Sequence, residues 1–384
     1  MRVLIAGGGT GGHLFPGFAV ARTLRRLDPA AEIHWVGGRR GMESRLVVAE
    51  GYPLTLLAAP SLRPAGAGPL AIARDAFALL RSLPQAISLL RRLRPSVVFA
   101  TGGYIAIPVL FAAALTRTPS LLWEGNVVAG RSNRLVARFA TARAVAWRET
   151  TADAPWSDPE THHTGTPVRD LAKVSRSAAR RALGIGDGAL LLLAFGGSQR
   201  ALRLESALSG VLESTLMDWH VIHAVGDGIK AAEERRSSLP ATLRDRYRPV
   251  EMLLGGAMEE ALVAADLLLG RAGASTIAEA AAAGLPAVIV PYPYAGGHQR
   301  ANATAFAAAG GGLLIDDVDC TPARLAEALE HFRSPALRSA AAVAARAIAR
   351  PDAAESIATI LFRIASPRSG AFGVSGQGSN GDPR

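Results

Sequence analysis

The 384-residue chain holds little of what marks a secreted or membrane-spanning protein. Its one cysteine, Cys320, cannot form an internal disulfide, as expected in a reducing cytoplasm. The longest apolar run, residues 104–115, is interrupted by Pro108 and is shorter than the roughly 18 residues that a membrane-spanning helix needs. Only "VLIA" precedes the first glycines, so the apolar core of a secretory signal is missing too. We therefore expect a soluble cytoplasmic protein.

Lysine is almost absent, since it occurs only at Lys173 and Lys230, and arginine supplies nearly all positive charge of a chain with a formal net charge of +10. Such a skew is typical of codon bias, and a solvated basic surface needs no functional explanation. A basic surface would nevertheless attract anionic lipid head groups or phosphorylated substrates. Because zinc-finger spacing, an RNA-binding aromatic motif and a dense basic tract are all missing, we expect no nucleic acid partner.

Short apolar runs alternate with helical patterns, which is typical of parallel sheets covered by helices. Strand-like runs lead into glycines within residues 2–9 and 96–104, and the pattern starts again at residues 189–199 and 265–284. Ligands of such sheets bind beyond the carboxyl ends of the strands. We predict an α/β fold of two doubly wound, Rossmann-like parallel-sheet domains that face each other across a cleft.

The polar, proline-containing stretch near residues 160–170 indicates a linker between the two domains. The predicted divisions are a first domain over 1–162, a second over 163–347, a C-terminal helix over 348–366 that packs back towards the first domain, and a Gly/Ser-rich, disordered tail over 367–384.

Six glycines lie in "IAGGGTGGHLFPG", residues 5–17, and three of them match the G-x-G-x-x-G fingerprint of dinucleotide-binding sites. The next strand ends in Arg39 and Arg40 instead of the acidic residue that would hold a ribose, although arginine can bind the extra phosphate of NADP. An NADP-dependent oxidoreductase is therefore one alternative, but it leaves the second half of the chain unexplained.

His13 follows these glycines in the first turn of a predicted helix. The partial positive charge of a helix N-terminus favours the neutral imidazole, and a neutral imidazole beside a cleft can act as a general base near pH 7. A histidine that only caps or packs at this position is the alternative.

The second half carries the signals of an anion site. "FGGSQ" places backbone N–H groups and the Ser198 hydroxyl at a helix start, and "RAGASTIAE" does the same with Ser275 and Thr276. Glu279 follows one turn later, where a carboxylate can accept hydrogen bonds from a ribose, and Arg169 in the linker can reach phosphates from between the domains. This pattern predicts a nucleotide diphosphate pocket, with a solvated glutamate and a surface arginine as the alternatives.

Taken together, seven segments resemble the MurG family of glycosyltransferases. In order along the chain they read "GGGTGGHLFPGFAVA", "ATGGY", "EGN", "GTPVR", "FGGSQ", "RAGASTIAEAAAAGLPAVIVPYP" and "HQRANA", and "PDAAESIA" at 351–358 extends the match. The resemblance implies a two-domain GT-B fold and inverting transfer of GlcNAc from UDP-GlcNAc to the MurNAc 4-hydroxyl of lipid I, which gives lipid II for peptidoglycan. It further implies a hexosyltransferase without cofactor or metal that acts peripherally at the cytoplasmic face of the cell membrane. In agreement, no convincing Asp-x-Asp loop is present, because "DDVD" at 316–319 follows the site segments.

The resemblance also implies roles for individual residues, with His13 as the base that deprotonates the acceptor hydroxyl. The substrate-binding residues it implies are Thr10, Gly11, Gly12, Asn126, Arg169, Ser198, Ala274, Ser275, Thr276, Ile277, Ala278, Glu279, His298 and Gln299. Gly102, Gly103 and Tyr104 would cradle the diphosphate of the acceptor.

The sequence departs from the family pattern in ways that bear on donor selectivity, at Trp123, Gly125, Thr166, Arg200 and Gly255. A UDP-sugar epimerase of the same architecture and a catalytically silent nucleotide-binding protein stay open as alternatives.

Residues 69–95 mix leucines with Arg74, Arg81, Arg91, Arg92 and Arg94. The resemblance implies that the first domain binds the lipid acceptor and associates with the membrane, and that the second domain binds UDP-GlcNAc. A basic amphipathic segment in the first domain can dock on an anionic membrane surface. The alternative is an ordinary helix pair whose leucines face the sheet.

Overall fold

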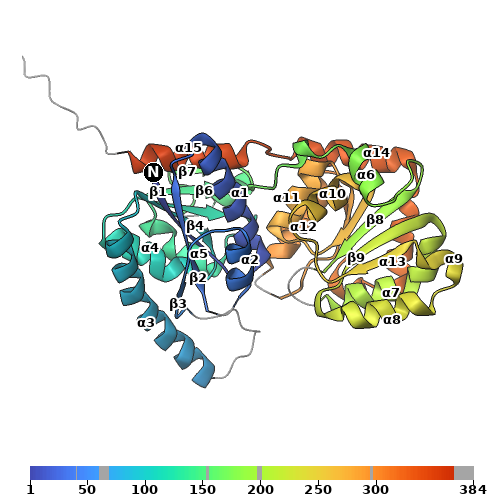
Figure 1. Ribbon diagram of the computed structural model, residues 1–384, viewed down its shortest axis with the longest axis horizontal. Coiled ribbons are helices and arrows are strands. Elements are labelled where there is room, and N and C mark those ends of the chain that lie inside the picture. The colour runs from blue at the N-terminus through green and yellow to red at the C-terminus, as the bar shows by residue number, and fades with distance from the viewer. Residues whose placement is uncertain (40, 60–68, 153–154, 197–200, 295–296, 367–384) are drawn as a thin grey trace, which may run out of the picture.

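The computed structural model describes residues 1–39, 41–59, 69–152, 155–196, 201–294 and 297–366. Two parallel sheets with helices around them lie side by side (Figure 1). In the described part of the chain, the first sheet has seven strands in the order β3-β2-β1-β4-β5-β6-β7, and the second has six in the order β10-β9-β8-β11-β12-β13. The prediction of two Rossmann-like α/β domains is confirmed. Ser198, Arg200 and the tail over 367–384 lie outside the described residues.

The strands of the first sheet are β1 (Arg2–Gly7), β2 (Glu32–Gly38), β3 (Leu54–Leu57), β4 (Val97–Gly102), β5 (Ser120–Glu124), β6 (Ala142–Val145) and β7 (Thr161–His163). The helices along this half of the chain are α1 (Gly11–Leu27), α2 (Glu43–Ala49), α3 (Pro69–Leu93), α4 (Ala106–Leu115) and α5 (Arg131–Val136).

The strands of the second sheet are β8 (Leu190–Phe195), β9 (Trp219–Ala224), β10 (Tyr247–Val250), β11 (Leu267–Gly270), β12 (Ala287–Ile289) and β13 (Gly312–Leu314). The later helices are α6 (Arg176–Ala182), α7 (Leu202–Asp218), α8 (Ile229–Ser238), α9 (Ala241–Arg244), α10 (Gly256–Ala264), α11 (Ala274–Ala283), α12 (His298–Ala308), α13 (Pro322–His331), α14 (Pro335–Ala347) and α15 (Ala353–Ala365).

The central strands read as continuous apolar runs because both of their faces are buried. In β1, Val3 and Ile5 belong to one hydrophobic cluster, whereas Leu4 and Ala6 belong to the cluster on the opposite face. The leucines of β8 divide between two clusters in the same way. Side chains of a strand alternate between the faces of the sheet, so each strand supplies two cores.

Both sheets reverse their strand order next to the first strand of the domain, between β1 and β4 and between β8 and β11. At the first reversal Gly7 pairs with Gly102, and at the second Phe195 pairs with Gly270. Ligands of doubly wound sheets bind at such switch points, beyond the carboxyl ends of the strands. The fold therefore places two candidate ligand sites, one in each domain.

The end of the described chain returns to the first domain. Helix α15 packs on α1, and Ile357 and Leu361 join the same hydrophobic cluster as Val3 (Figure 1). The two crossings between the domains touch each other, because a Cβ on Gly165 would lie 2.4 Å from the Cβ of Arg350. Gly165 has φ +86°, a conformation that glycine adopts without strain. Helices from both ends of the sequence, α1 and α15, therefore pack on the first domain.

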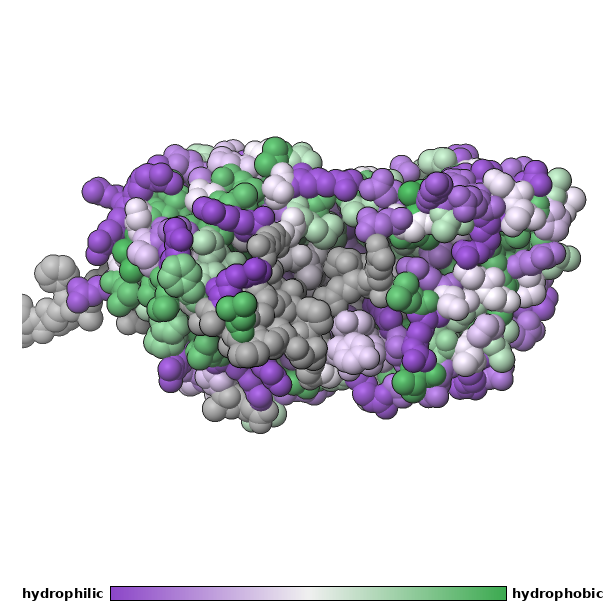
Figure 2. Space-filling model, turned by 90° about the horizontal axis from the view of Figure 1, so that it is seen from below, coloured by the Kyte–Doolittle hydropathy of each residue, from purple (hydrophilic) through white to green (hydrophobic). Residues whose placement is uncertain are grey.

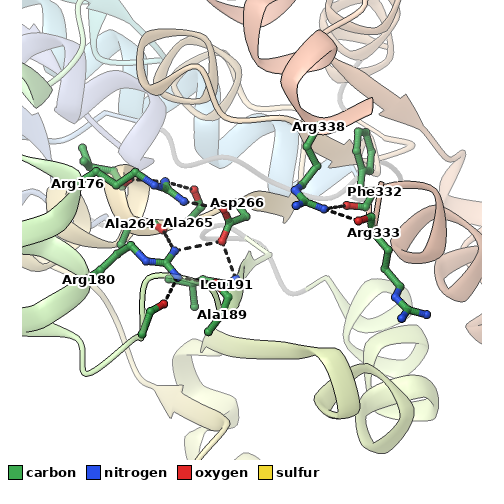
Figure 3. A network of polar contacts seen from close by, with 12 residues as sticks. Arg176, Arg180, Ala189, Leu191, Ala264, Ala265, Asp266, Phe332, Arg333 and Arg338 are labelled. Carbon is green, nitrogen blue, oxygen red and sulfur yellow. Dashed lines mark hydrogen bonds and ion pairs between the residues drawn. The ribbon is translucent and has the colours of Figure 1, made fainter. Parts of the chain in front are cut away.

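A buried arginine fixes α6 to the amino end of the second sheet (Figure 3). Arg180 is 3% exposed, and its guanidinium donates to the carbonyl oxygen of Ala264 at 3.0 Å and pairs with Asp266 at 3.2 Å. It also donates to the carbonyl oxygens of Gly186 and Ala189. These contacts lie at the opposite end of the sheet from the switch point, so their role is structural.

We predict that Arg180→Met destabilises the protein by about 3–5 kcal/mol, because loss of a buried partner leaves charge and carbonyl groups uncompensated. Urea unfolding followed by circular dichroism measures this. Arg333→Ala is the control, since Arg333 is 46% exposed and pairs with Glu330 and Asp218 at the surface, where the free energy of unfolding should hardly change. Equal midpoints for the Arg180 variant and the wild type would contradict the prediction.

Candidate active site

Two glycine turns meet at the switch point of the first domain. Gly9, between β1 and α1, has φ +87°, while Gly102 at the end of β4 and Gly103 after it have φ +102° and +79°. Only glycine adopts these angles readily, and a Cβ on Gly7 would lie 2.0 Å from the Thr101 hydroxyl oxygen. The turns need glycine because the two strand ends approach each other closely.

His13 lies between these turns, in the first turn of α1. Its Nδ1 donates to the carbonyl oxygen of Thr101 at 2.8 Å. Because a carbonyl oxygen only accepts, the neutral ring carries its proton on Nδ1 and leaves the lone pair of Nε2 available. A Cβ on Gly102 would lie 3.1 Å from His13 Cε1, and one on Gly103 3.3 Å from Cδ2, so the second turn packs tightly against the ring. The predicted base therefore has a defined tautomer and orientation.

Burial lowers the pKa of His13 below its ordinary value of 6.5. The hydrogen bond to Thr101 and the charges of Glu124 and Glu43 act in the opposite direction. The net effect keeps the ring neutral near pH 7, which is the form that a general base requires.

Glu124 organises the turn that follows β5. One carboxylate oxygen accepts from the backbone N–H and the side-chain amide of Asn126, at 2.9 and 2.8 Å. The other accepts from Gly130 N and from Asn133 Nδ2, both at 2.9 Å. Four donors on one buried carboxylate fix the turn that carries Asn126. Glu124 was not among the predicted site residues although it opens the "EGN" segment, because its four donors are brought together only by the folded turn.

Asn302 joins this turn to the second domain. Its side chain is fully buried in α12, donates to Asn126 Oδ1 at 3.0 Å and accepts from Val127 N at 3.0 Å. Beside it, His298 Nδ1 donates to the carbonyl oxygen of Val128 at 2.8 Å. The predicted residues Asn126 and His298 are thus brought together at the interface of the domains. Gln299 is nearby in sequence but its Oε1 accepts from Tyr292 N at 2.9 Å, within the second domain.

Arg169 lies between two carboxylates and an aromatic ring of the first domain. Its Nε donates to Glu279 at 2.7 Å and its Nη1 to Glu259 at 3.1 Å, while the guanidinium carbon is 5.2 Å from the centroid of the Phe15 ring. Burial alone would lower the pKa of Arg169, but the two carboxylates more than offset this and raise it. Burial raises the pKa of Glu279, and the charge of Arg169 opposes that shift. The residues predicted to bind diphosphate and ribose therefore contact each other.

Helix α11 begins at the switch point of the second domain and contacts α1. Its first backbone N–H groups have no partner within the helix and are available to an anion. The hydroxyl of Ser275 is buried and has no hydrogen-bond partner among the described residues. The predicted run from Ala274 to Glu279 hence offers a helix start, an unpaired hydroxyl and a carboxylate on one helix.

A cavity of about 230 Å³ lies between the domains, beside Arg169. The first domain lines it with Phe15, Phe18 and Arg22, and the second with Leu254 and Gly255. Gly255, one of the departures from the family pattern, has φ +51° and no atom close to its Cα. Glycine adopts this backbone angle without strain, whereas other residues rarely do. The cavity extends the predicted nucleotide site towards α1.

Two other departures from the family pattern, Trp123 and Gly125, depend on each other sterically. The ring of Trp123 is buried, and its Nε1 donates to the carbonyl oxygen of Gly165 at 3.0 Å. A Cβ on Gly125 would lie 2.4 Å from that ring, so the tryptophan requires glycine two residues later. The large ring and the missing side chain are one compensated change that fixes the crossing between the domains. Thr166 is buried next to this crossing.

The acidic stretch at residues 316–319, which was not predicted to be a metal motif, forms ion pairs with arginines. Asp317 binds Arg271 at 2.5 Å, and Asp316 pairs with Arg300. Among the residues that the structure describes, no three His, Cys, Asp or Glu side chains gather closely enough to hold a metal ion.

The two halves of α3 (residues 69–93) have different surroundings. Its second half packs on the sheet through Ala86, Leu89 and Leu90, whereas Phe77 and Leu80 in the first half are exposed. Figure 1 shows that the first half projects beyond the body of the domain, and Figure 2 shows hydrophobic and hydrophilic side chains interspersed on the first domain from below. Within the described ranges, no helix is both long and apolar enough to cross a bilayer.

The rest of the predicted residues surround the two turns. Thr10 precedes α1 and its carbonyl oxygen accepts from His13 N at 3.1 Å. Gly11 packs on Phe15, since a Cβ there would lie 2.7 Å from the ring, and Gly12 follows it. Tyr104, after the second turn, is exposed.

Comparisons with known proteins agree with this geometry. The model described as the glycosyltransferase family 28 N-terminal domain matches residues 3–145, and that of the C-terminal domain matches residues 191–357. The chain is 38% identical over 374 residues to a protein of Desulforudis audaxviator, with coverage of 95% of this chain and 99% of that one. It is 39% identical to a protein of a Nocardioides species, with coverage of 95% and 98%. Both relatives carry the name UDP-N-acetylglucosamine–N-acetylmuramyl-(pentapeptide) pyrophosphoryl-undecaprenol N-acetylglucosamine transferase.

Solved structures place the fold in the same group. Acinetobacter baumannii MurG superposes with a TM-score of 0.69 at 28% identity and covers 94% of this chain and 99% of its own. UDP-GlcNAc 2-epimerase from Neisseria meningitidis gives a TM-score of 0.69 at 13% identity, covering 94% and 100%, and shares the fold alone. The GT-B type of architecture is therefore confirmed. The chain belongs to glycosyltransferase family 28, and within it to the MurG family of N-acetylglucosamine transferases.

Proposed function

We propose that this protein transfers GlcNAc from UDP-GlcNAc to the 4-hydroxyl of MurNAc in lipid I, which gives lipid II, a precursor of peptidoglycan. The observation that carries the mechanism is the fixed tautomer of His13, whose Nε2 is available for a proton between two glycine turns. Membership of the family and the helix start at α11 support the donor and the direction of transfer.

The reaction is a direct displacement with inversion. His13 Nε2 takes the proton of the acceptor hydroxyl while its oxygen bonds to the anomeric carbon of GlcNAc. The bond from that carbon to the diphosphate breaks, and UDP leaves with the electron pair. The buried carboxylate of Glu124 stabilises the imidazolium that forms.

The donor binds in the second domain by an exchange of partners. Ribose hydroxyls donate to Glu279, so that Arg169 can turn from this carboxylate to the diphosphate. The N–H groups at the start of α11 and the hydroxyl of Ser275 add donors to the same anion. Charge that develops on the leaving diphosphate is thereby stabilised by groups already in place.

We assign the remaining roles as the family pattern implies. Asn126 contacts GlcNAc through the second lone pair of Oδ1, since Asn302 uses one. Donor contacts are further assigned to Thr10, Gly11, Gly12, Ser198, Ala274, Thr276, Ile277, Ala278, His298 and Gln299. Gly102, Gly103 and Tyr104 are assigned to the acceptor diphosphate.

The protein acts peripherally on the cytoplasmic face of the cell membrane, where its lipid acceptor is found. The exposed part of α3 offers Phe77 and Leu80 next to arginines, and Leu115, 67% exposed, lies at the end of the neighbouring α4. Apolar side chains with basic neighbours fit the interface of an anionic leaflet. The end of α4 extends the surface beyond the predicted stretch 69–95.

The variant His13→Ala should lower kcat by about a hundredfold or more, with a small change in KM for UDP-GlcNAc, because general-base catalysis contributes about 10²–10⁴ in rate. Transfer of radiolabelled GlcNAc to a short-chain lipid I analogue measures both constants. His331→Ala is the control, since His331 is exposed at the end of α13. Near wild-type turnover of the His13 variant would show that another group removes the proton.

Glu279→Ala should weaken binding of UDP about ten- to a hundredfold and leave kcat at saturating donor much less affected, because it removes a charged hydrogen-bond acceptor. Calorimetric titration with UDP measures the loss, with Glu213→Ala, an exposed position on α7, as the control. An unchanged affinity in a folded Glu279 variant would remove the ribose assignment.

Reversal of three α3 arginines, Arg74, Arg81 and Arg91, to glutamate should weaken binding to vesicles of phosphatidylglycerol and phosphatidylcholine by about a hundredfold. The matched control reverses three exposed arginines of the second domain, namely Arg181, Arg324 and Arg333. Flotation in a density gradient distinguishes the two. If both triple variants floated equally, α3 would not be the docking surface.

A further inference from the structure

A buried carboxylate lies beneath the first glycine turn, and the transfer reaction gives it no direct role. Glu43 is the first residue of α2, yet its side chain is only 1% exposed. Its Oε1 accepts from Gly9 N at 2.9 Å and from Gly38 N at 3.0 Å. The carboxylate therefore ties the turn before α1 to the end of β2.

Three glycines, Gly8, Gly37 and Gly41, leave room for this carboxylate. A Cβ on Gly8 would lie 2.0 Å from Glu43 Oε1, and one on Gly41 would lie 1.9 Å from Oε2. A Cβ on Gly37 would lie 2.7 Å from Cγ. These distances are too short for any side chain, so glycine at each position is a condition for the presence of Glu43.

Stability alone does not account for a carboxylate at this place. Oε2 is buried and has no hydrogen-bond partner in the part of the chain that the structure describes. A buried charge with unsatisfied acceptor capacity costs folding free energy, and an uncharged group would avoid that cost. A group kept against such a cost is a candidate for a functional role.

The turn held by Glu43 leads directly to His13. Gly9 donates to Glu43, and the next residue, Thr10, accepts from His13 N at 3.1 Å through its carbonyl oxygen. The charges that act on the His13 ring are Glu43 from α2 and Glu124 from β5, while the Thr101 carbonyl fixes Nδ1. Two buried carboxylates from different elements thus act on the charge of the ring.

We propose that Glu43 is a positioning residue of the transfer reaction. It holds the first glycine turn so that His13 meets the acceptor hydroxyl, and it supplies negative charge that balances the proton on the ring. The proton moves from the acceptor oxygen to Nε2, the new bond forms at the anomeric carbon, and the electron pair leaves with UDP. Glu43 itself keeps both of its N–H contacts and takes no part in the proton transfer. This inference rests on the proposed function.

The carboxylate also limits where phosphate can bind. In a dinucleotide site the pyrophosphate lies against the first glycine turn. Here Oε1 lies within hydrogen-bond distance of Gly9 N, so that N–H is already used and a negative charge faces the turn. The feature that positions His13 thus disfavours the NADP interpretation of the same glycines.

Glu43→Gln is the discriminating variant, because the amide oxygen can still accept from Gly9 and Gly38 while the charge is removed. We expect kcat to fall about tenfold or more, with KM for UDP-GlcNAc within about twofold, since the imidazolium that forms on His13 loses a stabilising negative charge. Loss of the negative charge should lower the pKa of His13, so the acidic limb of the kcat/KM profile should move to lower pH. A role confined to folding would leave that limb in place.

Two further variants complete the test. Glu43→Asp keeps the charge but is too short to reach both N–H groups, so kcat should fall while the pKa of His13 stays near that of the wild type. Glu32→Gln makes the same chemical change at an exposed position at the start of β2 and should behave as wild type. Titration of the imidazole proton signals by NMR, with His13→Ala to assign the peak, gives the pKa without any turnover.

The outcomes separate the inference from the proposed function. Wild-type kcat and an unmoved His13 pKa in Glu43→Gln would overturn the inference even if lipid II is formed normally. Absence of transfer by the wild-type protein would overturn the proposed function, while the NMR titration would still test the link between Glu43 and His13. If Glu43→Gln does not fold, wild-type kcat in Glu43→Asp would refute the positioning role.

Discussion

The site depends on one constraint, which is that each charge buried between the domains needs a partner with or without substrate. A desolvated charge without a partner costs several kcal/mol, so neither Arg169 nor Glu279 can be buried alone. They pair with each other at 2.7 Å, and Glu259 completes the group. In the proposed function UDP-GlcNAc enters by exchange, because its ribose offers donors to the glutamate and its diphosphate offers charge to the arginine. Donor binding is coupled in this way to the contact that Arg169 makes with Phe15 of the first domain.

The same constraint shapes the catalytic side. Three ionisable groups are close together at the first switch point, and two of them are carboxylates with four and two N–H donors. The charges of the two carboxylates oppose the fall in the pKa of His13 that burial causes. In the proposed mechanism the ring is therefore neutral before the proton transfer, and negative charges lie near the imidazolium that forms. Glycine makes this density of polar groups possible, since larger residues at Gly8, Gly37 and Gly102 would displace them.

The sequence predicts the parts of the structure that depend on local pattern. Apolar runs that end in glycine give the strands and turns of both switch points, and helical periodicity places Ser275 and Glu279 on one helix. What it misses depends on contacts between distant residues. Glu43 holds Gly9, which is 34 positions away, and Asn302 holds Asn126, which is 176 positions away. Nothing in "GMES" or "ANAT" indicates such partners, so their roles follow only from the folded chain.

The two sides of the cleft are held differently, because hydrogen bonds join the domains on one side and a cavity separates them on the other. This difference limits which side can open or close. On one side Asn302 and His298 bind the turn after β5, and the two chain crossings touch at Gly165 and Arg350. On the side of Arg169 there is a cavity lined by apolar groups such as Phe18 and Leu254. Hydrogen bonds between buried groups cannot lengthen without loss of a partner, whereas apolar walls around a cavity can separate or approach at lower cost. Adjustment to the donor is therefore easiest beside Arg169, and the turn that carries Asn126 acts as the fixed side.

The large ring of Trp123 strengthens that fixed side, because its Nε1 donates to the carbonyl oxygen of Gly165. The ring leaves no room for a Cβ at position 125, so the two departures from the family pattern, Trp123 and Gly125, occur together.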